Sequence, residues 1–211
     1  GQHRVYGYSQ STFKATNTIP VVAFSGLESS EQLEMFMDVN QNQKAVSPTL
    51  RITLEEDLYW ESGRLDSRLK ALRSSIISSL GGDQESPLSN KVSLGEDKAT
   101  LQAKPFSDAL LRCGLIPEAK GNKFIIQGEN RSLYNVLNED HRNEMKAAKK
   151  RILALLYASY ESAEDHLGSS GSVMEKFIVT NRGTYAFISL IGSLVNFEAT
   201  NSPPLLSCSD G

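Results

Sequence analysis

The sequence has little cysteine, and its two thiols exclude several classes of protein. Cys113 and Cys208 lie far apart in the chain, without a Cys-x-x-Cys pair or a histidine at zinc-ligand spacing. A disulfide-stapled secreted domain and a zinc module are therefore not indicated, and we expect reduced, structural or incidental thiols in a cytoplasmic protein.

A long apolar run is also absent. The longest apolar stretch, residues 185–195, contains Ser189, Gly192 and Ser193. It is well short of the roughly 20 residues that a membrane-spanning helix needs. It predicts a buried helix, and no membrane partner is expected.

The familiar catalytic signatures are missing as well. The sequence contains no Gly-x-x-x-x-Gly-Lys-Ser/Thr loop, no His-Glu-x-x-His and no Gly-x-Ser-x-Gly. No pair of carboxylates stands beside a histidine. We predict no metal site, and whether the protein is an enzyme stays open.

What is present is the composition of a folded domain. Of the 211 residues, 39% are hydrophobic and 22% charged, which is typical of soluble globular proteins. The net charge of −3 and pI near 5.7 argue against a globally basic nucleic-acid coat, although a local basic patch survives such an average.

Hydrophobic spacing predicts a predominantly helical α+β protein, with a few short strands in the N-terminal part and a helical C-terminal part. A β-branched run at Thr18–Phe24 indicates a buried strand. Ser29 and Gln32 form a capping-box pattern that opens a helix through Asn40. Ser47 and Pro48 predict the start of the next helix, and a leucine repeat predicts another that ends at Gly81–Gly82.

The second half shows similar signals. We expect a helix over Pro105–Cys113, a strand over Lys123–Gln127, one or two helical turns over Ser132–Leu137, and helices over Asp140–Leu167 and Thr184–Phe197. The predicted organisation is a core portion over residues 1–81, a loop or hinge over 82–104, a helical portion over 105–200 and a disordered tail over 201–211.

The first residues form the most informative stretch, Gly1-Gln2-His3-Arg4-Val5-Tyr6-Gly7-Tyr8. If Gln2–Tyr8 is helical, an amide, an imidazole and a guanidinium lie on the first turn, beside unpaired N–H groups and the positive end of the helix dipole. Such a turn can bind phosphate or carboxylate. The alternative is an ordinary exposed turn.

A resemblance strengthens the anion-site interpretation. Residues 1–7 resemble the word that names the DGQHR-domain proteins, and residues 38–48, with Asn40, Gln43, Lys44, Ser47 and Pro48, are similar to a second motif of that family. The family includes relatives of DndB, a regulator of DNA sulfur modification, and is distantly related to the ParB/sulfiredoxin superfamily. The Asp that should precede Gly1 is absent, so the chain looks like an N-terminally truncated fragment.

The resemblance implies phosphate or nucleotide binding by Gln2, His3 and Arg4, with Asn40, Gln43 and Lys44 on the opposite side. A nucleoside triphosphate is the candidate cofactor. The sulfiredoxin-type reaction needs a cysteine where this chain has Gln2, so thiol chemistry at this turn is not expected. For residues 40–44, the alternative is a solvated connector whose amides cap helix ends.

Basic residues at helical spacing suggest a weaker nucleic-acid site. They are Arg64 and Arg68 on one predicted helix and Lys146, Lys149 and Lys150 on another, with Lys70, Arg73 and Arg151 nearby. A backbone-phosphate contact and a merely solvated helix face are both consistent with this pattern. His141 and His166 are expected at the surface.

Three functions follow as hypotheses. The first is a cytoplasmic, nucleotide- or phosphate-binding, DNA-associated protein that acts as a regulator, for example of transcription, or as a component of a DNA-modification or phage-defence system. Its partners would be DNA, a nucleotide or other proteins of that system. The second is an enzyme that hydrolyses a nucleotide or phosphodiester, with His3 as acid or base. The third is a protein-interaction scaffold whose polar motifs only cap helices.

Overall fold

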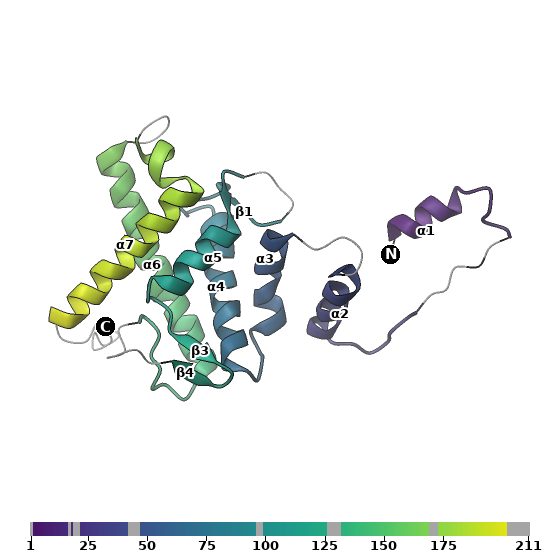
Figure 1. The fold of residues 1–211 in the computed structure, drawn as a ribbon, viewed down its shortest axis with the longest axis horizontal. Helices are drawn as coiled ribbons and strands as arrows, with labels where there is room; N and C mark the ends of the chain where they lie inside the picture. Colours follow the sequence, from purple (N-terminus) through teal and green to yellow (C-terminus); the bar gives the residue numbers. More distant parts are fainter. Residues whose placement is uncertain are drawn as a thin grey trace.

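The computed structural model describes residues 2–16, 18, 22–41, 47–95, 99–125, 132–168 and 173–201. These residues form a predominantly helical α+β structure, which confirms the predicted class (Figure 1). The elements are α1 (Gln2–Ser9), α2 (Ser29–Gln41), α3 (Pro48–Tyr59), α4 (Leu65–Gly82), β1 (Val92–Ser93), β2 (Leu101–Gln102), α5 (Ala103–Arg112), β3 (Glu118–Lys120), β4 (Lys123–Ile125), α6 (His141–Leu167), the π-helical turn η1 (Met174–Ile178) and α7 (Asn181–Asn201).

Helix α4 is the centre of the body. Its leucines and isoleucines recur every three or four residues, so they share one side of the helix. Leu72, Ile76 and Leu80 are fully buried there. Helices α3, α5 and α6 and both small sheets contact α4. The predicted helix and its end at Gly81–Gly82 are confirmed.

The starts of α3 and α6 follow from their capping residues. The Ser47 hydroxyl accepts a hydrogen bond from the Leu50 amide at 3.1 Å, and Pro48 occupies the first turn, as predicted. The Asp140 carboxylate accepts from the Asn143 amide at 3.0 Å. Both caps satisfy N–H groups that have no partner within the helix.

The N-terminal strand prediction is wrong. Residues 22–25 are not in a strand, and Val22 and Phe24 are 78% and 58% exposed; residues 19–21 of the run lie outside the description. Both described sheets are built from residues 92–125, so the run has no partner strand among them. A β-branched run without a partner cannot satisfy its backbone by pairing.

The strands lie instead in the middle of the chain. β1 and β2 pair in parallel, Val92 opposite Leu101, and β3 and β4 form an antiparallel hairpin. The β4 strand confirms the described part of the strand predicted at Lys123–Gln127. The turns predicted over Ser132–Leu137 are not helical; they are bends and turns around the buried Tyr134.

The segment predicted as a loop or hinge, residues 82–104, contains β1, β2 and the beginning of α5. Within it, Leu88, Val92 and Leu101 are buried in the same core cluster as α4, α6 and α7. The described residues on either side of this segment therefore share one hydrophobic core. The predicted domain boundaries otherwise stay predictions, and the tail beyond residue 201 lies outside the description.

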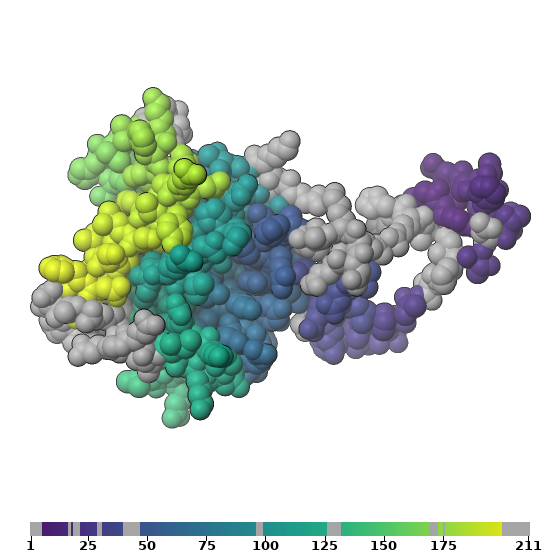
Figure 2. Space-filling view, viewed as in Figure 1, coloured from purple at the N-terminus to yellow at the C-terminus, as the bar shows by residue number. Residues whose placement is uncertain are grey.

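Helices α1 and α2 lie to one side of the body. Figure 2 shows α1 apart from the surface that α3 to α7 form. Helix α2 confirms the helix predicted through Asn40, and at its start the Glu31 carboxylate accepts a hydrogen bond from the Glu28 amide at 2.9 Å. On α2, Met37 is buried and Phe36 is 48% exposed. Among the described helices, none has the length and apolarity needed to cross a bilayer.

Candidate functional site

Of the predicted anion site, Gln2, His3 and Arg4 belong to helix α1. The side chains of these three residues lie outside the description. Asn40 belongs to the last turn of α2, and Gln43 and Lys44 lie in the undescribed residues 42–46. Convergence of the two motifs on one anion remains a prediction.

The basic residues at the start of α4 are engaged by the protein itself. Arg64 donates to both oxygens of Asp66, at 3.1 and 2.8 Å. These hydrogen bonds lower the pKa of Asp66 to about 2. Arg68 donates to the Ser62 carbonyl oxygen at 2.8 Å. Contacts of this kind stabilise the α3–α4 turn, which does not support the predicted nucleic-acid role of Arg64 and Arg68.

Arg73, from the same predicted basic face, is half-buried. Burial lowers the pKa of its guanidinium, and the negative charges of Glu55, Glu118 and Asp108 partly oppose that shift. Burial raises the pKa of Glu55, and the nearby cations, chiefly Lys70 and Arg73, partly oppose that shift. Arg73 is therefore half-buried among carboxylates of the protein itself, which does not support a contact with phosphates.

Arg151 on α6 likewise has a structural role. Its guanidinium pairs with Glu144, which is 3% exposed, and its Nε donates to the Leu133 carbonyl oxygen at 3.0 Å. The Glu144 carboxylate also accepts from the Asn135 amide at 2.7 Å. Arg151 thus anchors the segment before α6 and neutralises a buried carboxylate.

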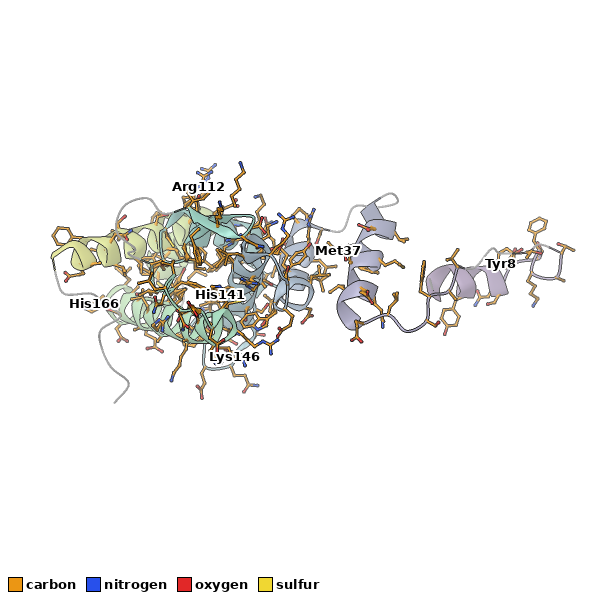
Figure 3. The ribbon with its side chains drawn as sticks, turned by 90° about the horizontal axis from the view of Figure 1, so that it is seen from below. Tyr8, Met37, Arg112, His141, Lys146 and His166 are labelled. Carbon is orange, nitrogen blue, oxygen red and sulfur yellow. The ribbon has the colours of Figure 1, made fainter. Side chains whose placement is uncertain are left out.

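The lysines of α6 divide into two kinds. Lys149 is half-buried with its Nζ 3.9 Å from a Glu56 oxygen. Lys146 and Lys150, one helical turn apart, are exposed, and within the described ranges neither has an ion-pair partner. Figure 3 labels Lys146 at the edge of the body. The nucleic-acid role predicted for these two lysines stays a prediction.

A cleft between α2 and the α3–α4 turn has the opposite charge. Its volume is about 720 Å³. Its lining includes Arg64 and Lys70, but carboxylates outnumber them: Glu28, Glu31, Glu34, Asp57 and Glu61. A phosphate would be repelled from this cleft, so its residues do not extend the predicted anion site.

An open apolar groove between α6 and α7 was not predicted. Its volume is about 570 Å³, and it is lined by Ala158, Ser159, Ser162, Ala163, His166, Leu167, Ile178, Phe187, Leu190, Ile191 and Leu194. The stretch 185–195 is helical as expected but not wholly buried. Leu190 and Leu194 are 54% and 56% exposed. A helix that is apolar on every face is typical of a buried helix, so the sequence pattern predicted burial of the whole stretch and did not indicate that one face is exposed.

Among the described side chains, His141, His166 and Cys113 do not form a reactive centre. His166 is exposed, and its Nδ1 donates to the Ser162 carbonyl oxygen at 2.7 Å; His141 is half-buried at the start of α6. Cys113 is a buried free thiol, and burial raises its pKa to about 11. In the part of the chain that is described, no cluster of His, Cys, Asp and Glu could hold a metal ion.

Comparison with known proteins returned no match. No family model, no curated protein and no solved structure matches the chain.

Proposed function

We propose that the chain is a phosphate- or nucleotide-binding, DNA-associated regulator or component of a DNA-modification or defence system, with the start of α1 as its anion site. The observation behind the proposal is that the stretch with Gln2, His3 and Arg4 is helical and belongs to α1. At a helix start, backbone N–H groups without partners and the positive end of the helix dipole can bind an anion. Arg4 in this stretch would add a bidentate donor for phosphate.

Two further observations support this proposal. Helix α1 stands apart from the body, so helices α3 to α7 do not cover it (Figure 1). The second motif behaves as its sequence predicts where it is described, because Ser47 caps α3 and Pro48 lies in its first turn. The exposed Lys146 and Lys150 would supply a weak contact to a nucleic-acid backbone.

Isothermal titration of nucleotides and short DNA duplexes into the chain and its Arg4→Ala variant tests the proposal. We expect the wild type to bind and Arg4→Ala to bind at least tenfold more weakly. Arg112→Ala is the control, because Arg112 is also an exposed arginine but lies on α5 and not on α1, so its binding should be unchanged. A bound ligand should also raise the thermal midpoint of the wild type.

The same samples separate the alternatives. If the wild type releases inorganic phosphate and His3→Ala does not, the protein is a hydrolase and the regulator hypothesis is rejected. Equal binding by wild type and Arg4→Ala, or binding by neither, would reject α1 as an anion site.

A further inference from the structure

The groove between α6 and α7 leaves large apolar side chains in contact with solvent. Leu190 and Leu194 on α7 are 54% and 56% exposed, and Leu167 at the end of α6 is 39% exposed. Phe197, which follows Leu194 by three residues, is 64% exposed. Contiguous apolar surface of this kind marks interaction sites on folded proteins. Phe187 and Ile191 form its floor, so the exposed residues continue a surface that is already packed.

The shape of the groove suits a helix. Phe187, Leu190 and Leu194 line it and are spaced by three and four residues, so they form one row along α7. At 1.5 Å per residue, the row is about 10 Å long, or two helical turns. The α6 wall runs from Ala158 to Leu167. A helix with apolar residues at positions i, i+3, i+4 and i+7 fills a groove with two helical walls.

The charges at the edges specify the character of that helix. Asp165 continues the row of Ala158 and Ser162 on α6, with Glu161 beside it, and Glu198 continues the row of Ile191 and Leu194 on α7. All three carboxylates are exposed. The lining, as far as the structure describes it, contains no lysine or arginine. The negative end of the α6 dipole adds to the same field.

We propose that this groove, defined by the lining residues given above, binds a basic amphipathic helix of a partner protein, with leucine-like residues in the groove and Lys or Arg against Glu161, Asp165 and Glu198. Two other occupants fit less well. A second copy would oppose two acidic edges, and each chain carries a net charge of −3. The other is the chain's own residues 202–211, which contain Leu205 and Leu206 but no lysine or arginine to pair with the acidic edges.

The first test uses two synthetic peptides of about 18 residues with the same leucine stripe, one flanked by lysines and one by glutamates. Fluorescence anisotropy on the full chain should show that the lysine peptide binds at least about tenfold more tightly, with the difference shrinking at high salt. Equal binding of the two peptides, or binding of neither, would overturn the proposal.

Variants locate the site. Leu190→Glu with Leu194→Glu should weaken binding of the lysine peptide at least about tenfold, whereas the control Leu137→Glu, at an 86% exposed position outside the groove, should leave binding unchanged. Glu161→Lys with Asp165→Lys should reverse the preference between peptides, and Glu85→Lys should not. These positions are exposed, so each variant should unfold at the wild-type temperature.

Two results would assign the groove to another occupant. A concentration-dependent dimer in sedimentation velocity that Leu190→Glu abolishes would identify a second copy. Tighter peptide binding after removal of residues 202–211 would identify the chain's own end. Unchanged lysine-peptide affinity in the Leu190→Glu, Leu194→Glu variant would reject the groove altogether. Each outcome is independent of phosphate binding by α1, which the Arg4→Ala titration measures.

Discussion

The ring of Phe187 on α7 meets the ring of Tyr160 on α6 edge-on, with centroids 4.9 Å apart and planes inclined by 65°. Edge-to-face pairs stabilise a fixed approach of two elements beyond the area they bury. Because Phe187 also lines the groove, this contact sets the separation of the two helices that form its walls.

Replacing Phe187 with alanine should therefore loosen the α6–α7 contact. We expect a loss of about 2 kcal/mol in the free energy of unfolding, since the substitution removes partly buried apolar area and the aromatic contact. Urea denaturation measures it. Phe197→Ala, ten residues along the same helix and 64% exposed, is the matched control and should change stability by less than about 0.5 kcal/mol. Equal losses in the two variants would contradict the role assigned to the ring pair.

Gly192 allows α7 to approach α5 closely. A Cβ at this position would lie 2.0 Å from the Cys113 carbonyl oxygen, so Gly192→Ala forces the two helices apart. We expect a destabilisation of about 3 kcal/mol. In Gly82→Ala the nearest contact is an ordinary 3.8 Å, and that variant should gain about 0.5 kcal/mol through lower entropy of the unfolded chain. Thermal unfolding of the two variants tests the expected loss and the expected gain of stability. An unchanged stability of Gly192→Ala would show that α7 and α5 do not approach each other closely at this position.

The pairing of Arg151 with Glu144 predicts a coupled effect. Arg151→Met leaves a buried carboxylate without its cation and should cost about 2 kcal/mol of stability. Adding Glu144→Gln removes that charge while keeping an acceptor for the Asn135 amide, so the double variant should be more stable than Arg151→Met. A denaturation-based double-mutant cycle measures the coupling. Lys150→Met on the exposed face is the control; additive effects of the paired substitutions would refute the link.

Asp66 predicts a dependence of stability on acid. Its pKa is lowered from 3.8 to about 2, first by the Arg64 hydrogen bonds, with a further contribution from the Gly121 amide. Its ionised form therefore favours the folded state above pH 3.8, and this stabilisation is lost as the pH falls toward 2, where the unfolded chain has already bound the proton. The thermal midpoint of Asp66→Asn should fall less than that of the wild type over this range. The exposed Asp57→Asn should follow the wild type; a parallel decline in Asp66→Asn would contradict the assignment.

Much of the helical framework was predictable from local signals. The caps at Ser47 and Asp140, the leucine repeat of α4 and Gly81–Gly82 are encoded within a few residues, and each predicted helix there is confirmed. The strand expected at Thr18–Phe24 failed because a strand depends on a distant partner that a local pattern does not reveal.

Side-chain roles were harder to predict for a related reason. Arg73, Arg151 and Lys146 look alike in sequence, yet the first is half-buried near Glu55, the second pairs with Glu144 and the third is exposed. Their roles depend on neighbours from other helices. The groove was missed on the same grounds, because the spacing of residues 185–195 indicates apolar faces but not which of them another element covers.

The central position of α4 makes its amides an internal reference for hydrogen exchange. Its amides are enclosed by α3, α5 and α6, so they exchange with deuterium only when the whole body opens. The amides on the exposed side of α7, near Leu190 and Leu194, can open by fraying that leaves α4 intact. A ligand on that side of α7 would slow the local openings before it slowed exchange at α4, and exchange rates along one chain would then tell a docked partner from a general gain in stability.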